Sequence, residues 1–413
     1  MTNFLVELQC PQCGAPAILE ETDRMFRCEY CRVRSYLMRK DYFRYMLPDA
    51  APENKELLFF PYWRFRGMLF SCLPDKTEHR FADVSCQAVG SEHFPDSVGL
   101  RSQALKLRFV SPETEGRFLQ PVLSIREAMH IFGRRFNVCL QSPVLHQSFI
   151  GETLSLIYAP FYMADSSPTG SRQLFDAVLN EPISSSSPDN SDISLFRVGP
   201  PDWRIRLIPT LCPNCGWDMD GERDAVALTC KNCDSVWESG GDRFRKVVFA
   251  HIPKTGDNVV FLPFWKIRAD VSEIELDSYT DMVRIANLPK VIKKDAKFHF
   301  WAPAFKLRPR IFLNLSRNIT LFQPRQELAE GLPNVRLWPV TLPVTEAFEI
   351  LKITLASFLK PRKLLLTLFR DIKITPKESL LVYVPFTQEH HEFVQPEFQQ
   401  AVHKNVLAMS KNL

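Results

Sequence analysis

The chain has 413 residues, of which 45% are hydrophobic and 12% aromatic, and its formal net charge is +4. This is a globular composition that can fill about two or three domains. The small net charge excludes binding to nucleic acid or an anionic membrane through the field of the whole protein, so such binding would need a local patch. The richest apolar stretch, 346–369, is interrupted by lysines, an arginine and a proline, and we expect no membrane span.

The N-terminal residues do not resemble a signal peptide, because no basic segment precedes the short apolar patch at 4–6. We therefore expect a cytoplasmic protein. Eight of the eleven cysteines fall in close pairs. In a reducing compartment such pairs indicate metal ligation rather than disulfides.

The first group of paired cysteines follows a predicted strand in which Phe4, Val6 and Leu8 point to one side. Its members are Cys10, Cys13, Cys28 and Cys31. Two cysteines separated by two residues can turn both sulfurs toward one ion, and two such pairs complete a tetrahedral shell. Gly14 follows the second cysteine, where a tight turn needs positive φ. We expect residues 17–20 to pair with 25–28 around a turn at 21–24.

Basic and aromatic residues alternate in the segment that follows, 24–45. Rings can stack on bases while arginines contact phosphates, so this segment is a possible surface for nucleic acid or another partner. The candidate residues are Arg27, Tyr30, Arg32, Arg34, Tyr36, Arg39 and Lys40. A solvated face or a protein contact is the alternative.

The second half of the chain repeats landmarks of the first half. Adding 202 to each cysteine number of the first group gives Cys212, Cys215, Cys230 and Cys233. The same offset places residues 59–66, FFPYWRFR, on residues 261–268, FLPFWKIR. Two looser matches relate 156–161 to 381–386 and 118–121 to 300–303. These matches predict an internal duplication.

Both cysteine groups resemble the zinc-ribbon domains, over residues 4–37 and 205–238. The resemblance implies two structural zinc sites of four cysteines each, with two zinc ions per chain. A rubredoxin-like iron site, which would make the chain an electron carrier, is the alternative. The second group is surrounded by acidic residues, which would repel phosphate, so nucleic-acid binding is expected of the first ribbon only.

The predicted fold is α+β and β-rich, in which each half is a zinc ribbon followed by a mainly antiparallel β domain with a few helices. The predicted segments are zinc ribbon 1 (1–45), β-rich domain 1 (46–180), a linker (181–200), zinc ribbon 2 (201–245) and β-rich domain 2 with a helical insertion (246–413). Capping and periodicity predict helices at 124–132, 171–179, 326–330, 345–358 and 397–413. Prolines 61, 263 and 385 suggest edge strands or bends.

Other candidate sites have weaker support. The aromatic strands around Trp63 and Trp265 favour a core over an exposed groove. Residues 389–392, EHHE, favour a surface loop over a metal or acid–base site. Cys72, His79 and Cys86 are widely spaced for a third metal site, and Cys139 lacks a nucleophile context.

No common catalytic motif is present in the sequence, and no catalytic residue is assigned. We therefore expect a non-catalytic zinc-binding interaction or scaffold protein with a protein partner. A nucleic-acid-associated factor that uses the segment 24–45 is the alternative.

Overall fold

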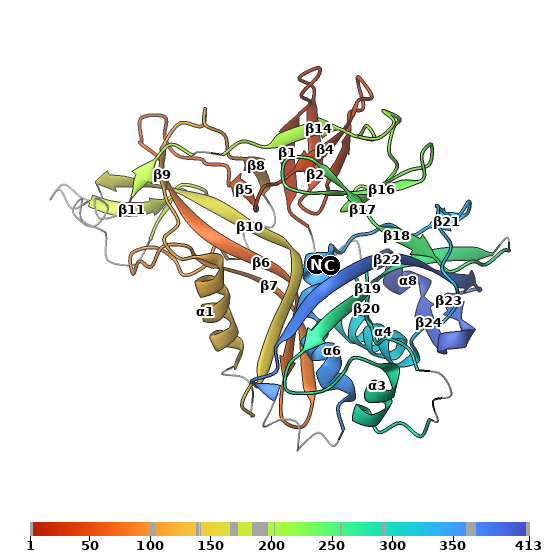
Figure 1. Ribbon diagram of the computed structural model, residues 1–413. Coiled ribbons are helices and arrows are strands. Elements are labelled where there is room, and N and C mark those ends of the chain that lie inside the picture. Colours follow the sequence, from red (N-terminus) through yellow and green to blue (C-terminus); the bar gives the residue numbers. More distant parts are fainter. Residues whose placement is uncertain are drawn as a thin grey trace. The chain divides into compact units, whose positions relative to one another are not determined.

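The computed structural model of the protein (Figure 1) describes residues 3–99, 105–137, 140, 142–165, 172–183, 197–201, 203–256, 258–290, 292, 295–360 and 369–409. Among the described residues, strands account for 41% and helices for 16%, so this part of the chain is β-rich as predicted. The chain forms two compact units. Unit 1 comprises Met1–Arg66, Asp83–Val138 and Thr153–Pro209, and unit 2 comprises Gly67–Ala82, Cys139–Glu152 and Thr210–Leu413. No helix in the described ranges has both the length and the apolar character that a bilayer crossing needs.

Unit 1 is built on a large mixed sheet. Its strands are β1 (Leu5–Gln9), β2 (Pro16–Glu20), β3 (Met25–Arg27), β4 (Arg34–Met38), β5 (Phe43–Met46), β6 (Leu58–Cys72), β7 (Thr77–Gln87), β8 (Lys106–Phe109), β9 (Arg117–Leu119), β10 (His146–Asp165), β11 (Arg172–Asp176), β12 (Glu181–Pro182), β13 (Val198–Gly199) and β14 (Arg206–Pro209). The sheet order is β13-β9-β6-β10-β5-β8-β1-β2, with β7 on β6 and β11 and β12 on β10. Strands β14, β4 and β3 form a separate small sheet.

Strand β6 is the centre of the large sheet, and every one of its 15 residues is buried. Burial on both faces explains its nearly continuous run of aromatic and aliphatic residues. Gly67 is required where β6 approaches β10, because a Cβ at this position would lie 2.3 Å from the Ile150 carbonyl oxygen. The ends of β6, β7 and β10 belong to unit 2.

Helix α1 (Ile125–Asn137) lies beside the long strands of unit 1 in Figure 1. It begins as the sequence predicts: the Ser124 hydroxyl accepts a hydrogen bond from the Glu127 N–H, and the Glu127 carboxylate accepts one from the Ser124 N–H. This reciprocal capping satisfies donors that a helix start leaves unpaired. The helix continues five residues beyond the predicted end at 132.

Unit 2 contains a second, smaller sheet and most of the helices. Its strands are β15 (Ala227–Cys230), β16 (Ser235–Ser239), β17 (Phe244–Val247), β18 (Phe249–His251), β19 (Val259–Val271), β20 (Phe300–Pro303), β21 (Arg336–Leu337), β22 (Ile374–Gln388), β23 (Glu392–Gln395) and β24 (Gln400–His403). Its helices are α3 (Tyr279–Ile285), α4 (Pro309–Phe322), α5 (Val344–Glu349), α6 (Leu351–Phe358), η2 (Pro396–Phe398) and α8 (Lys404–Met409). The sheet order is β20-β19-β22-β23-β24, and β15, β16 and β17 pair separately.

The central strands of the two units have the same backbone environment. In unit 1, β9 runs parallel to β6, and Ala88 donates to the Pro61 carbonyl. In unit 2, β21 runs parallel to β19, and Ala304 donates to the Pro263 carbonyl. The buried indoles also match, since the Trp63 Nε1 donates to the Leu123 carbonyl at 2.8 Å and the Trp265 Nε1 to the Leu342 carbonyl at 2.9 Å.

These contacts confirm that the aromatic strands are core, because Trp63 and Trp265 are each 2% exposed. The expectation that their prolines mark edge strands is wrong for β6 and β19, which lie inside sheets. In a β-strand, the backbone nitrogen and oxygen of one residue point to the same side. The Pro263 oxygen accepts a hydrogen bond from Ala304, so the Pro263 nitrogen also faces Ala304. This position lies between the residues of β19 that pair with β21 and those that pair with β20. Proline is tolerated at this position because no carbonyl of a neighbouring strand needs an N–H donor there.

Several local predictions are wrong. Residues 172–176, predicted as a helix, form β11 because pairing with β10 overrides the capping signal. Residues 326–330 are not helical, whereas the unpredicted α4 starts at Pro309. The helix predicted at 345–358 exists as α5 and α6, and 397–409 contains η2, β24 and α8. Residues 118 and 300 do not correspond, since β9 is parallel to β6 but β20 is antiparallel to β19.

Some predicted features fall outside the described residues. The serine-rich part of the linker, 184–192, lies there, as does Cys139. Residues 206–209, inside the range predicted for the second ribbon, form β14 and pair with β4 of the first ribbon.

Candidate metal centres

The first four-cysteine cluster lies at the tips of two hairpins of unit 1. Strands β1 and β2 pair on either side of Cys10 and Cys13, and β3 and β4 pair on either side of Cys28 and Cys31. The predicted pairing of 17–20 with 25–28 is therefore wrong. Each hairpin instead carries one cysteine pair at its turn, which is how two short hairpins can share one ion.

The turns hold the cysteines by backbone hydrogen bonds and left-handed residues. Gly14, at φ 71°, donates to the Cys10 carbonyl at 2.9 Å, which confirms the need for glycine. Arg32 takes the same place after the second pair, at φ 60°, and donates to the Cys28 carbonyl at 3.1 Å. No glycine follows the second cysteine pair, so the sequence did not indicate this second left-handed turn.

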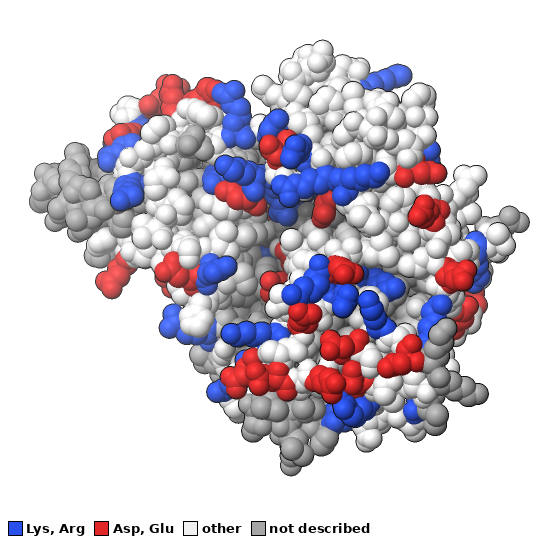
Figure 2. Space-filling view, in the orientation of Figure 1, with Lys and Arg blue, Asp and Glu red and all other residues white. Residues whose placement is uncertain are grey.

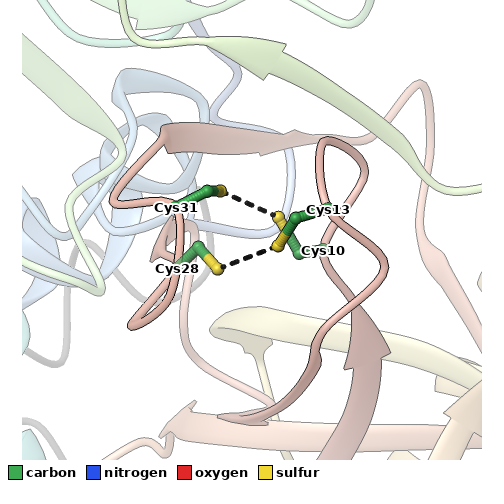
Figure 3. A group of neighbouring side chains, drawn as sticks. All are labelled: Cys10, Cys13, Cys28 and Cys31. Carbon is green, nitrogen blue, oxygen red and sulfur yellow. Dashed lines mark hydrogen bonds between the residues drawn. The ribbon is translucent and has the colours of Figure 1, made fainter.

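The four sulfurs converge as a tetrahedral ion requires (Figure 3). The Cys10 and Cys31 sulfurs are 3.6 Å apart, as are those of Cys13 and Cys28, and all four lie within 4.8 Å of one another. Bonds of about 2.3 Å to a central zinc ion give tetrahedron edges of about 3.8 Å. All four thiols are free, and their separations fit metal ligation rather than disulfides.

The second cluster, in unit 2, repeats this geometry. The Cys212 and Cys233 sulfurs are 3.6 Å apart and those of Cys215 and Cys230 are 3.5 Å apart. Gly216, at φ 72°, donates to the Cys212 carbonyl at 2.8 Å. Both glycine turns therefore have the same conformation.

The Ser235 hydroxyl group contacts the second cluster. Its hydroxyl lies 3.1 Å from the Cys233 sulfur and accepts a hydrogen bond from the Trp237 indole N–H at 2.8 Å. Because the indole occupies a lone pair of the hydroxyl oxygen, the hydroxyl hydrogen can point to the sulfur. Such outer contacts orient metal ligands and stabilise thiolates.

The close approach of the four sulfurs in the second cluster favours a cation between them. Hydrogen bonds from Asn214 and Ser235 lower the pKa of Cys233 to about 6. Burial raises the pKa of Cys230 to about 12. Four close thiols cannot all lose their protons at neutral pH without a positive charge between them, and a bound metal ion supplies that charge. The residues of both clusters fit such an ion.

Four thiolates in a tetrahedron are ligands of zinc and of iron. Among the described residues, the two four-cysteine clusters are the groups of three or more ligand side chains close enough to share an ion. Cys72 and Cys86 are buried, and His79 does not join them in such a group. His390 and His391 lie in an exposed turn before β23.

No protein-family model, no curated protein and no solved structure matches this chain. The role of the clusters therefore has to follow from their chemistry and from the surfaces beside them.

Two large aromatic side chains are exposed beside the clusters. Tyr30, between Cys28 and Cys31, is 71% exposed, and Trp217, directly after Gly216, is 62% exposed. In the described part of the chain, these are the two exposed side chains among the phenylalanines, tyrosines and tryptophans. Leu211, which precedes Cys212, is also exposed. Sequence reasoning missed Trp217, although its place next to a cysteine pair leaves little core to bury it.

The basic surface predicted on the first ribbon is only partly at the surface. Arg27, Tyr30, Arg32 and Lys40 are exposed. Arg34 and Arg39 are half-buried, whereas Tyr36 is fully buried in β4 and presents no ring for stacking. On the face shown in Figure 2, lysine and arginine side chains gather over the strands labelled β5, β8 and β1 in Figure 1.

Proposed function

We propose that this chain is a non-catalytic interaction or scaffold protein whose two four-cysteine clusters hold structural zinc ions. Each cluster has four protein ligands, so a tetrahedral ion bound there keeps no open position for a substrate. Short hairpins with little core of their own gain their folding energy from such an ion. Zinc is preferred to iron because a structural role needs no redox change.

The observation that carries the proposal is the exposure of Tyr30 and Trp217 beside the two clusters. Aromatic side chains are costly to leave in water and are enriched at the centres of protein interfaces. Metal-fixed turns hold them rigid, which lowers the entropy lost on binding. The two rings therefore provide contact points for a protein partner in the cytoplasm.

We further propose that the two units arose by duplication of a zinc ribbon joined to a β domain. The supporting observations are the offset of 202 in both the cysteines and the Trp motifs, and the matching hydrogen bonds of Trp63 and Trp265. The parallel strands β9 and β21 add a match that the sequence did not show.

A nucleic-acid-associated role is the second candidate, supported by the exposed Arg27, Arg32 and Lys40. The neighbouring basic residues of β8 are less available to phosphate, since Arg108 and Lys106 both lie beside the Glu7 carboxylate, at 3.1 and 3.8 Å. If nucleic acid binds, its affinity should fall steeply as salt is raised and should depend on the three exposed basic residues.

The test compares partners captured by the full-length wild-type protein with those captured by a Tyr30→Ser/Trp217→Ser variant in extracts of the native host. A Val122→Ser/Val248→Ser variant is the matched control, because these valines are 66% and 71% exposed but are not next to cysteines. We expect one or more proteins to be lost at least tenfold from the aromatic variant only, with metal content unchanged in all three proteins. Equal capture by all three would contradict the proposal.

A further inference from the structure

Unit 1 contains a cleft of about 320 Å³ that is separate from the cysteine cluster. Helix α1 provides Ile131, Phe132 and Phe136 on one side, and β7 provides residues 83–86 on the other. This volume falls within the range of small-molecule sites, which combine apolar walls with a few polar groups.

The apolar wall of the cleft is well packed. The rings of Phe132 and Phe136 meet edge to face with centroids 4.6 Å apart, and Phe132 stacks on Phe65 of β6 at 5.8 Å. Phe4 and Ile157 complete this wall. These contacts fix the side chains in place, so the space between them is preformed.

The third side of the cleft is a loop, 97–99, which hydrogen bonds hold against β7. The Val98 N–H donates to the Ser85 hydroxyl at 3.0 Å. Further along, the Gln87 amide donates to the Phe94 carbonyl at 2.7 Å and to the Ser91 carbonyl at 2.9 Å. The loop is thus tied to the strand that carries the polar end of the cleft.

That polar end is formed by Arg64 and Asp83. The Arg64 guanidinium, 3% exposed, donates to Asp83 Oδ1 at 3.0 Å, contacts Glu21 and lies over the Phe4 ring. Glu21 also pairs with Arg66. Two arginines and two carboxylates sum to zero charge, so a charged ligand would add an uncompensated charge to a buried site.

One acceptor at this end is left over. Within the described part of the chain, Asp83 Oδ2 is buried and has no hydrogen-bond partner. An unpaired buried carboxylate oxygen is unfavourable, and a ligand donor toward which the Asp83 carboxylate turns would pair it. The cleft thus combines an aromatic wall, a charge-neutral polar end and one spare acceptor.

We propose that unit 1 binds, in the cleft between α1 and β7, a small neutral molecule with a flat apolar body and one hydrogen-bond donor that is received by Asp83. The apolar body lies between Phe132 and Ile131 of the helix and the strand residues. The donor, a hydroxyl or N–H group, reaches the carboxylate. This binding role is independent of the metal clusters and of the exposed aromatic residues.

The experiment uses 2-naphthol and 2-methylnaphthalene as probes, because they share a bicyclic apolar body and differ in the donor. Binding to the full-length protein is measured by naphthol fluorescence and by calorimetry. We expect 2-naphthol to bind wild-type protein with a Kd on the order of 0.1 mM and at least tenfold more tightly than 2-methylnaphthalene. Equal affinities would overturn the role of Asp83, and no binding of either probe would overturn the site.

Two variants locate the binding. Ile131→Trp fills the cleft and should abolish binding of both probes, whereas Val122→Trp, at an exposed position outside the cleft, should change nothing. If Ile131→Trp binds the probes like wild type, they bind elsewhere and the proposal fails.

A measurement on wild-type protein does not depend on the variants folding. Cys86 lines the cleft and is 7% exposed. Saturating 2-naphthol should slow its alkylation by iodoacetamide at least fivefold, read by peptide mass spectrometry. An unchanged rate at saturation would contradict the proposal.

Discussion

The strands around Trp63 in unit 1 and Trp265 in unit 2 share their core hydrogen bonds but differ in their charged residues. Arg64 and Arg66 are buried and pair with Glu21, which lies in the first ribbon between β2 and β3. At the same places in unit 2, Arg268 reaches the exposed Glu378 at 3.4 Å and Lys266 lies over the Trp301 ring. The aromatic framework is common to both units, whereas the polar contacts are particular to each.

This difference shows that a buried charged residue reinforces the contact between the cysteine hairpins and the sheet in unit 1. In unit 1, the hairpin of β1 and β2 joins the large sheet by the pairing of β1 with β8, and the buried Glu21 adds ion pairs to Arg64 and Arg66 through its two oxygens. In unit 2, the cysteine hairpins are also joined to the rest of the unit through the backbone, since the Val226 N–H donates to the Val340 carbonyl at 2.8 Å. Substitutions at the metal ligands, at the buried ion pairs and at the shared tryptophans should distinguish the contributions of these contacts.

Loss of a metal ligand should affect each ribbon separately. Cys13→Ser and Cys215→Ser each leave a cluster with three sulfurs, and structural zinc sites of this kind contribute on the order of 10 kcal/mol to the folding of their own hairpins. We expect each variant to lose one metal ion and the hydrogen-exchange protection of one ribbon only. Loss of protection in both ribbons would contradict separate attachment.

Removal of the buried carboxylate should destabilise unit 1. Glu21→Gln leaves Arg64 and Arg66 buried with less compensation, which should cost about 3–5 kcal/mol of unfolding free energy in urea denaturation. The matched change in unit 2, Glu378→Gln, removes an exposed ion pair and should cost about 0–1 kcal/mol. Similar losses of unfolding free energy in both variants would show that burial of the Glu21 carboxylate does not make it more stabilising than the exposed Glu378.

Acid should destabilise unit 2 through His146. Burial, with a smaller effect of Lys352, lowers the pKa of His146 to about 4. The unfolded chain binds this proton near pH 6.5, so the stability contributed by the neutral ring is present above pH 6.5 and is lost as the pH falls toward 4. The loss should reach up to about 3 kcal/mol, and His146→Gln should remove it. An unchanged slope of stability against pH between 6.5 and 4 in that variant would exclude His146 as the cause.

The buried tryptophan that the two units share should contribute equally to the stability of each unit. Trp63→Phe and Trp265→Phe each remove one indole hydrogen bond and part of a buried ring, and each should cost about 1–3 kcal/mol. Thermal unfolding should therefore give matching losses. A large difference between the two variants would weaken the case for a duplicated framework.

The parts of the structure that the sequence predicts are those fixed by local chemistry. Cysteine spacing is enough to predict both clusters, because an ion forces the four sulfurs together whatever the rest of the chain does. Ser124 and Glu127 predict the start of α1 for the same reason, since both partners of the cap lie within one turn.

The parts that it does not predict depend on distant residues. Residues 21–24 are charged and polar like a surface turn, yet Glu21 and Arg24 are buried, because Glu21 meets Arg64 and Arg66 more than forty positions along the chain. Tyr36 looks like part of a basic surface, but β4 turns it inward. The cleft beside α1 joins segments from six separate parts of the chain, and no local pattern marks it.

Metal analysis of the whole chain, purified without added metal, decides whether the two cysteine clusters hold structural zinc ions. Elemental mass spectrometry should find two zinc ions per chain with negligible iron, falling to one ion in Cys13→Ser and in Cys215→Ser. The zinc protein should show no visible absorption and no change on reduction. A content well below two metal ions per chain, or stoichiometric iron that bleaches on reduction, would contradict the account.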